Sequence, residues 1–268
     1  MKKIAVLLLI SLLLPSAEAL LVVGDSGSGS IYTNGAGAGT GWDYVGNLIG
    51  TAPSSVSYVS NGWFLTANHV WTGDVVGRNE NILNLGGTGY SINLGSYTSI
   101  TNANGTSADL CMFRVNALAG LPAGMAVLES TPHWSSSLRL IGNGYDNGGI
   151  TGMTWGNGTP YKAGSSTLTL LVGDTASYLS IYDSGIEGDA YAQTYDSGGG
   201  VFVDGQLAGV MFSIGTYGGE DVTVVTDFSV YGQQINQTSV IPEPTTAILL
   251  AGVALAFGII KRFRYMYQ

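Results

Sequence analysis

Short apolar runs, separated by turns rich in Gly, Asn, Ser and Asp, recur through the middle of the chain. Runs of this kind, with many β-branched and aromatic side chains, are typical of strands rather than helices. The dipeptide Asp204-Gly205 suits the tight primed turn of a hairpin. The expected strands lie at 57–60, 62–67, 82–85, 90–94 and 110–115, then at 125–128, 137–141, 167–172, 178–182, 201–203, 206–211 and 223–226, with a short closing helix at 228–235. The pattern predicts an all-β protein of the barrel or sandwich type.

The N-terminal end departs from this pattern. Lys2 and Lys3 precede an apolar run at 4–14, and Ala17-Glu18-Ala19 follows it. A positive start, a short apolar core and a small-residue ending are typical of a secretory signal peptide. Residues 1–19 are therefore predicted to be cleaved off after Ala19, although an uncleaved anchor is the alternative. Residues 20–41, rich in Gly and Ser, are expected to form a flexible lead-in.

The C-terminal segment 240–268 carries a second targeting pattern. Pro242-Glu243-Pro244 is followed by an apolar run at 247–260 and by a basic cluster at 261–264. Together these features resemble the PEP-CTERM sorting signal of bacterial exported proteins. The resemblance implies an exosortase-type sorting enzyme as partner, transient anchoring of the short helix in the inner membrane, and delivery to the cell surface or extracellular matrix, with the periplasm as the other destination. A plain C-terminal membrane anchor is the alternative.

Charge and cysteine content narrow the function classes. The net charge is −9, and residues 20–240 hold four basic side chains against sixteen acidic ones. A nucleic-acid partner is not expected, because phosphate binding needs a basic surface. The single cysteine, Cys111, cannot form an internal disulfide and is expected to be a buried structural thiol. No paired-cysteine or His-Glu-x-x-His motif is present, so no metal or cofactor is expected.

Ser197 is the candidate nucleophile because it lies in a run of glycines, at 195–200. A serine hydroxyl reacts poorly at neutral pH unless a base lies beside it. The sequence offers only two histidines, His69 and His133, and neither follows Ser197. His69 follows an apolar strand and Asp109 opens another, whereas His133 is expected in a surface loop. Of the chain orders known for Ser, His and Asp, only His69, Asp109, Ser197 puts each residue in a credible structural context.

Three motifs carry a resemblance to a known family. Thr66-Ala67-Asn68-His69, Asp109-Leu110 and Asp196-Ser197-Gly198-Gly199 resemble the chymotrypsin/trypsin-like serine endopeptidases. The resemblance covers residues 42–236. It implies two six-stranded antiparallel β-barrels, at 42–122 and 123–236, with the active site in the cleft between them.

The resemblance also implies roles for individual residues. Ser197 would attack the scissile carbonyl of a polypeptide substrate, and His69 would take its proton and return it to the leaving amine. Asp109 would orient His69, and the backbone N–H groups of Tyr195 and Ser197 would form the oxyanion hole. The chain departs from the family at Tyr195, where glycine is usual. That departure keeps open an alternative function, a catalytically impaired surface or matrix binding protein.

Substrate and activation sites follow from the same resemblance. Ser213, Ile214 and Gly215 match the wall along which a substrate backbone adds as a strand. Counting six residues back from Ser197 places Tyr191 at the floor of the specificity pocket, which predicts a preference for neutral side chains. In many family members the residue matching Asp196 pairs with a freed N-terminal amine. Here the lead-in is expected to separate Leu20 from the barrel.

Overall fold

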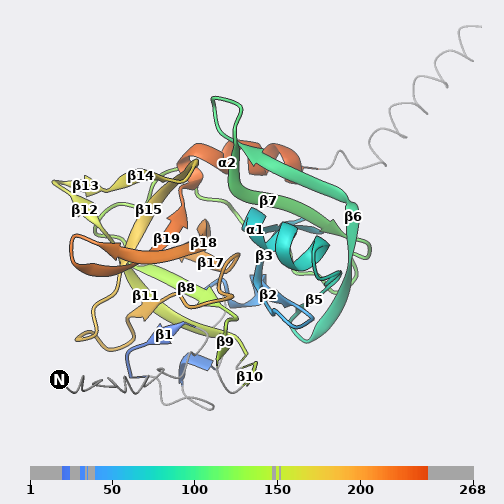
Figure 1. The fold of residues 1–268 in the computed structure, drawn as a ribbon, viewed down its shortest axis with the longest axis horizontal. Helices are drawn as coiled ribbons and strands as arrows, with labels where there is room; N and C mark the ends of the chain where they lie inside the picture. The colour runs from blue at the N-terminus through green and yellow to red at the C-terminus, as the bar shows by residue number, and fades with distance from the viewer. Residues whose placement is uncertain are drawn as a thin grey trace, which may run out of the picture.

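The computed structural model describes residues 20–24, 31–33, 35, 40–146, 149–150 and 152–240. The predicted signal peptide and, except for Val240, the predicted sorting segment lie outside these residues. The described chain forms two β-barrels, which lie side by side in Figure 1. Within the described part of the chain, no helix is long and apolar enough to span a membrane.

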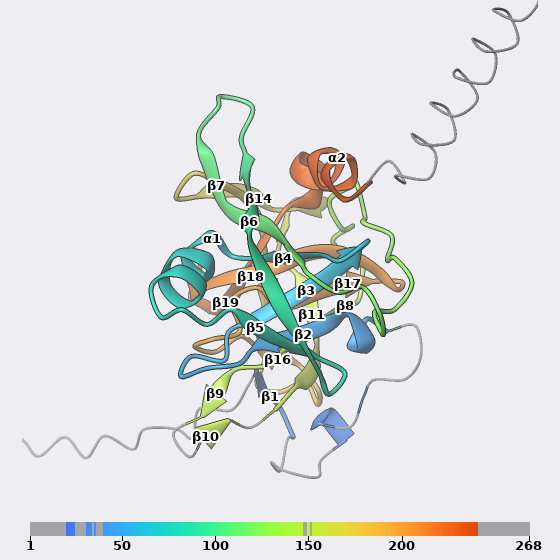
Figure 2. The same cartoon turned by 90° about the vertical axis from the view of Figure 1, so that its right-hand side faces the viewer.

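The N-terminal barrel is a closed antiparallel barrel with the strand order β2-β3-β4-β7-β6-β5. Its strands are β2 (Val45–Leu48), β3 (Ser55–Ser60), β4 (Trp63–Thr66), β5 (Ile82–Leu85), β6 (Thr88–Thr101) and β7 (Ser107–Val115). Between β4 and β5 the chain leaves the barrel as α1 (Asn68–Val70) and a π-helical turn at Trp71–Val76. In Figure 1 this helical segment lies over the N-terminal barrel, and Figure 2 shows it at one side of the strands. It carries His69, the candidate base.

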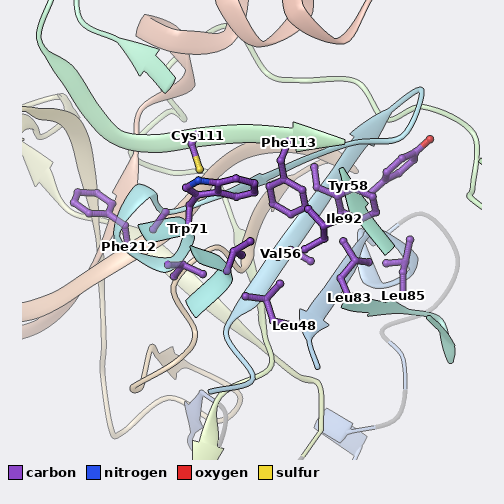
Figure 3. Close-up of a cluster of buried hydrophobic side chains, with 14 of the residues drawn as sticks. Leu48, Val56, Tyr58, Trp71, Leu83, Leu85, Ile92, Cys111, Phe113 and Phe212 are labelled. Carbon is purple, nitrogen blue, oxygen red and sulfur yellow. The ribbon is translucent and has the colours of Figure 1, made fainter. Parts of the chain in front are cut away.

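A cluster of buried apolar side chains anchors that helical segment. Trp71, two residues after His69, packs with its ring centroid 5.4 Å from that of Phe113 on β7. Figure 3 shows both rings beside aliphatic side chains of the barrel, with Phe212 of the second barrel at the edge of the same cluster. The predicted buried thiol of Cys111 lies here and is fully buried. The backbone around His69 is therefore fixed by packing on both barrels.

The C-terminal barrel closes six strands in the order β11-β8-β17-β18-β19-β15, through pairing of β11 with β15, and β14 extends the sheet. These strands are β8 (Leu138–Gly142), β11 (Thr154–Pro160), β14 (Thr169–Val172), β15 (Thr175–Ile181), β17 (Gly200–Val203), β18 (Gln206–Tyr217) and β19 (Glu220–Thr226). The hairpin predicted at Asp204-Gly205 joins β17 to β18. The prediction of two six-stranded antiparallel barrels is confirmed.

Small elements complete the described fold. Helix α2 (Phe228–Ser239) lies beside the β6–β7 hairpin in Figure 2 and bridges the barrels, because Tyr231 Oη accepts from Ala176 N and donates to Asn102 Oδ1. The remaining elements are β1 (Leu21–Val22), β9 (Tyr145–Asp146), β10 (Gly149–Ile150), β12 (Lys162–Ala163), β13 (Ser166–Thr167), β16 (Ala190–Tyr191) and two 3₁₀ turns, Ile31–Thr33 and Trp42–Tyr44.

Some expected elements differ from the structure. The strand expected at 125–128 is only a single bridge, between Val127 and Leu207. Strand β11 was not expected, because its sequence contains two glycines, which are depleted in strands. Both glycines are needed there: a Cβ on Gly156 would lie 2.4 Å from that of Ala190, and one on Gly158 would lie 2.3 Å from the Ser180 hydroxyl.

Candidate active site

A cleft of about 350 Å³ lies between the barrels and brings most of the predicted site together. Its lining comes from both barrels: Ser54, His69, Val70, Asp74 and Arg78 on one wall, and Ala192–Tyr195, Ser197 and Met211–Ile214 on the other. Asp109 lines a neighbouring cavity of about 630 Å³, which shares His69, Phe212 and Ser213 with the cleft. The predicted base, nucleophile and oxyanion residues thus meet at the barrel junction.

His69 is held by Asp109 at two points. The His69 backbone N–H donates to Asp109 Oδ1 at 2.8 Å, and the ring atom Nδ1 lies 2.7 Å from Oδ2. The hydrogen bond with Asp109 raises the pKa of His69, burial opposes this, and the negative charges of Asp109 and Asp74 add to the increase. This arrangement fixes the ring so that Nε2 is left for a substrate or nucleophile.

Asp109 is held in turn by the second barrel. Its backbone N–H donates to the hydroxyl of Thr175 at 2.7 Å, and Thr175 is buried at the start of β15. His69 and Ser197 line one cleft without a direct hydrogen bond between them. In ligand-free enzymes such bonds are often long and tighten when substrate binds.

The loop that carries Ser197 depends on glycine. Gly198 has φ of 92°, in the left-handed region, and a Cβ there would lie 2.0 Å from the carbonyl oxygen of Ser55. Only glycine fits this backbone. The Gly198 N–H also donates to Met211 O at 2.8 Å, which ties the loop to β18. Within the described residues no group accepts a hydrogen bond from the Ser197 N–H, so this donor is available to an oxyanion.

Two serines of β3, in the N-terminal barrel, form hydrogen bonds with the loop that carries Ser197. Ser57 Oγ donates to the Gly198 carbonyl at 2.8 Å, and Ser55 N donates to the Tyr195 carbonyl at 3.1 Å. Both serines are fully buried. Sequence reasoning did not single them out; the available signal was two serines at alternate positions of a strand, which places them on one face.

Tyr195 adopts the backbone conformation that glycine usually supplies. Its φ is 74°, in the left-handed region, where a Cβ costs roughly 1–2 kcal/mol. The hydrogen bond from Ser55 to its carbonyl holds it there. A tyrosine at this position is therefore compatible with the backbone path that the oxyanion role requires.

The expected separation of Leu20 from the barrel is wrong. Leu20 is fully buried, and its N–H donates to Asp196 Oδ2 at 2.9 Å. Strand β1 directly after it pairs with β16, which returns the start of the chain to the second barrel. Burial raises the pKa of Asp196 to about 7, against weaker lowering by backbone hydrogen bonds that include the one from Leu20. The Gly- and Ser-rich composition of the lead-in led to the wrong expectation for this contact, which joins residues 176 positions apart.

The predicted substrate wall lies in the cleft, whereas the residue predicted for the pocket floor does not line it. Strand β17 pairs with β18 only as far as Val210, whereas β18 continues to Tyr217 with β19 on one side. Ser213 and Ile214 line the cleft and Gly215 follows them on this strand. Tyr191 lies outside the cleft lining: its ring packs 5.7 Å from that of Tyr182, and Ala192 lines the cleft instead.

Asp189 and His133, the second histidine of the sequence, lie away from the cleft. Asp189 is buried and accepts a hydrogen bond from Asp183 N at 2.5 Å. His133 is exposed, and its Nδ1 lies 2.8 Å from the Ser135 hydroxyl. Within the described residues no group of His, Cys, Asp and Glu side chains is arranged to hold a metal ion.

Comparison with known proteins agrees with this geometry. The trypsin family model matches residues 31–235. The structure is similar to that of the Rv3671c protease from M. tuberculosis in its active form, with a TM-score of 0.55 and 16% identity over 90% of this chain and 95% of that one. An inactive form of the same protease, carrying a serine-to-alanine mutation, gives a TM-score of 0.54 and 17% identity over 81% and 97%. No curated protein matches in sequence.

The double barrel and its interbarrel cleft define the chain as a serine-type endopeptidase, a hydrolase that acts on polypeptides. The chain belongs to the trypsin family. The alternative of a binding protein that has lost its chemistry is not favoured by these matches.

Proposed function

We propose that this protein is an exported endopeptidase that hydrolyses peptide bonds through an acyl-enzyme on Ser197. The observation that carries the proposal is the shared position of His69, Ser197 and Tyr195 in one cleft, with Asp109 bonded to His69. In the reaction, Ser197 Oγ attacks the carbonyl carbon while His69 Nε2 takes its proton. The backbone N–H groups of Tyr195 and Ser197 stabilise the negative oxygen that forms.

Collapse of this intermediate breaks the peptide bond. His69 then gives its proton to the leaving amine, and the acyl group stays on Ser197 as an ester. A water molecule, activated by His69, hydrolyses the ester and restores the hydroxyl. Asp109 keeps the His69 ring in place and stabilises the transient imidazolium.

Export and activity are connected through Leu20 in this proposal. Signal-peptide cleavage after Ala19 would convert the Leu20 N–H, 2.9 Å from Asp196 Oδ2, into an ammonium group. A buried carboxylate is stabilised far more by an adjacent cation than by an amide N–H. Removal of the leader would therefore complete the support of the Ser197 loop. The segment at 240–268 would then deliver the enzyme to the surface through an exosortase-type partner.

The triad is tested with Ser197→Ala and His69→Ala in the protein beginning at Leu20. Either change should abolish peptide hydrolysis and labelling by an active-site phosphonate, because each removes a group that the acylation step uses. His133→Ala is the matched control and should retain both signals. Undiminished hydrolysis in either triad variant contradicts the assignment. Export is tested separately by N-terminal sequencing of the mature protein, which should begin at Leu20.

A further inference from the structure

One wall of the cleft is built by the segment that follows His69. Asp74 and Arg78 lie on this wall together with Ser54, which precedes β3. Within the described residues, Arg78 is the one arginine or lysine that lines the cleft. The other three basic side chains of this part of the chain stack on tryptophan rings elsewhere: Arg114 on Trp63, Arg139 on Trp155 and Lys162 on Trp134.

Asp74 positions Arg78 rather than binding a substrate itself. One Asp74 carboxylate oxygen pairs with the Arg78 guanidinium, and the other accepts from the Ser54 hydroxyl at 2.5 Å. The Asp74 side chain is 9% exposed, whereas that of Arg78 is 47% exposed. A ligand in the cleft therefore meets the guanidinium. An arginine held by a buried carboxylate is pre-organised, so less entropy is lost when it binds a second partner.

The same segment is tied to the loop before β3. The Asp74 carbonyl accepts from Arg78 N and from Glu80 N, each at 3.2 Å. Glu80 in turn accepts from the backbone N–H groups of Thr51 at 2.6 Å and Ala52 at 3.1 Å. These bonds make the Arg78 wall a connected unit rather than a loose loop.

This wall is separate from the cavity that holds Asp109. Ser213 of β18, along which the acyl half of a substrate is expected to add as a strand, lines both that cavity and the cleft. Arg78 lines the cleft with His69 and Ser197 but not the cavity with Asp109. A substrate whose acyl half lies along β18 beside Asp109 would place the residues just after the scissile bond near Arg78.

We propose that Arg78 is a specificity-determining residue that selects an acidic side chain in the first two residues after the scissile bond. The inference rests on the proposed function, because that function sets which half of the substrate passes this wall. A guanidinium offers the donor fork that matches a carboxylate.

The test compares paired peptides that differ only by Glu or Gln at the first or second position after the cleaved bond. The wild-type enzyme should cleave the Glu peptide with a kcat/KM about three- to tenfold higher, as expected for a partly exposed charged pair. In Arg78→Ala this ratio should fall to about one. Taking the ratio within each variant cancels any change in the fraction of folded enzyme. Arg78→Lys keeps the charge and should retain part of the preference.

Lys162→Ala is the matched control, because it removes one positive charge outside the cleft. It should leave the ratio unchanged. A wild-type ratio of one or below, or an unchanged ratio in Arg78→Ala, overturns the proposal.

Binding to Ser197→Ala separates this inference from the proposed function. Ser197→Ala should bind the Glu peptide about three- to tenfold more tightly than the Gln peptide, and adding Arg78→Ala should bring this ratio to about one. If the wild-type protein cleaves no peptide but Ser197→Ala still prefers Glu through Arg78, the proposed chemistry fails and the subsite stands. If cleavage occurs without any Glu preference in either measurement, the subsite fails and the chemistry stands.

Discussion

The two halves of the active site are built in different ways. The half around His69 is assembled mainly within one barrel, because Asp109 lies 40 positions away and contacts both its backbone and its ring, while Thr175 of the second barrel adds one hydrogen bond to Asp109. The half around Ser197 is assembled by distant segments: Leu20 contacts Asp196 across 176 positions, and Ser57 contacts Gly198 across 141. The first half takes its His–Asp pair from a single barrel. The second needs the other barrel and the segment at Leu20.

This difference shows which contacts decide whether the site is in its active conformation. The His69–Asp109 pair is formed by two segments of the N-terminal barrel, with Thr175 of the second barrel as an added support of Asp109. An oxyanion hole made from backbone N–H groups exists only when remote contacts fix that backbone. Changes to the first half should therefore act on the chemistry itself, and changes to the second should act on how much of the protein is competent.

The largest effect is expected from Asp109→Asn. The amide favours the wrong tautomer of His69, so kcat should fall on the order of 10⁴-fold while the fold persists. Loss of the hydrogen bond and charge that raise the pKa of His69 should also shift the acidic limb of the kcat/KM profile to lower pH. Both are measured by steady-state kinetics across pH. Asp204→Asn, the same replacement in the exposed β17–β18 turn, is the control. A loss below tenfold in Asp109→Asn would remove the contrast between the halves.

An intermediate effect is expected from retaining Ala19, so that Leu20 keeps an amide instead of an amine. In this form the pKa of Asp196 is raised to about 7, above its unfolded value of 3.8. The folded state then holds the proton more tightly, so stability falls as pH rises from about 4 to 7. With a free Leu20 ammonium the buried pair should prevent this loss, a difference of about 3 kcal/mol above pH 7.

The measurement is unfolding by denaturant at pH 5 and pH 8 for both forms, together with kcat/KM. The form that keeps Ala19 should be less stable and less active at pH 8. Asp196→Asn in that form should flatten the pH dependence, because no carboxylate remains to titrate. Equal stability and activity of the two forms at pH 8 would show that the Ser197 half does not depend on the N-terminus.

The smallest effect is expected from Tyr195→Gly. Glycine removes the cost of a Cβ at φ of 74°, so the protein should gain about 1 kcal/mol in the free energy of unfolding. Activity should be retained, because the donor proposed for the oxyanion is the backbone N–H of this residue, which glycine also has. Asp204→Gly, at φ of 48° in the hairpin turn, is the stability control outside the cleft. A large loss of kcat in Tyr195→Gly would mean that the tyrosine side chain takes part in binding.

The sequence predicted the parts of this molecule whose signals are local. Strand patterns and the Asp204-Gly205 turn led to an all-β protein of the barrel or sandwich type. The motifs at His69, Asp109 and Ser197, each of adjacent positions, led to the family and through it to the two barrels. Glycines in β11 concealed a strand, because their role is to admit Ala190 and Ser180 rather than to fill the core. Counting back to Tyr191 led to a position outside the cleft lining, because a count cannot follow the path of an irregular loop.

Contacts between remote segments were harder to predict. The family resemblance pointed to an amine beside Asp196, but the Gly- and Ser-rich residues after Leu20 led to the expectation that this end stays apart from the barrel. Two ordinary strand serines, Ser55 and Ser57, support the Ser197 loop only because the two barrels are in contact. Arg78 was visible as one of few basic residues, but its place in the cleft follows from the fold of the segment after His69.

The hydrogen bond from Ser57 to the Gly198 carbonyl has a consequence for self-digestion, the cleavage of one copy of a protease by another. Self-digestion requires one molecule in the active conformation and another that has opened enough to be cleaved. Because the active conformation of the Ser197 loop needs both barrels in contact, a molecule that opens at the barrel junction loses its activity in the same event. A molecule that has opened can therefore be cleaved but cannot cleave others. In a concentrated solution the least stable copies should be degraded first.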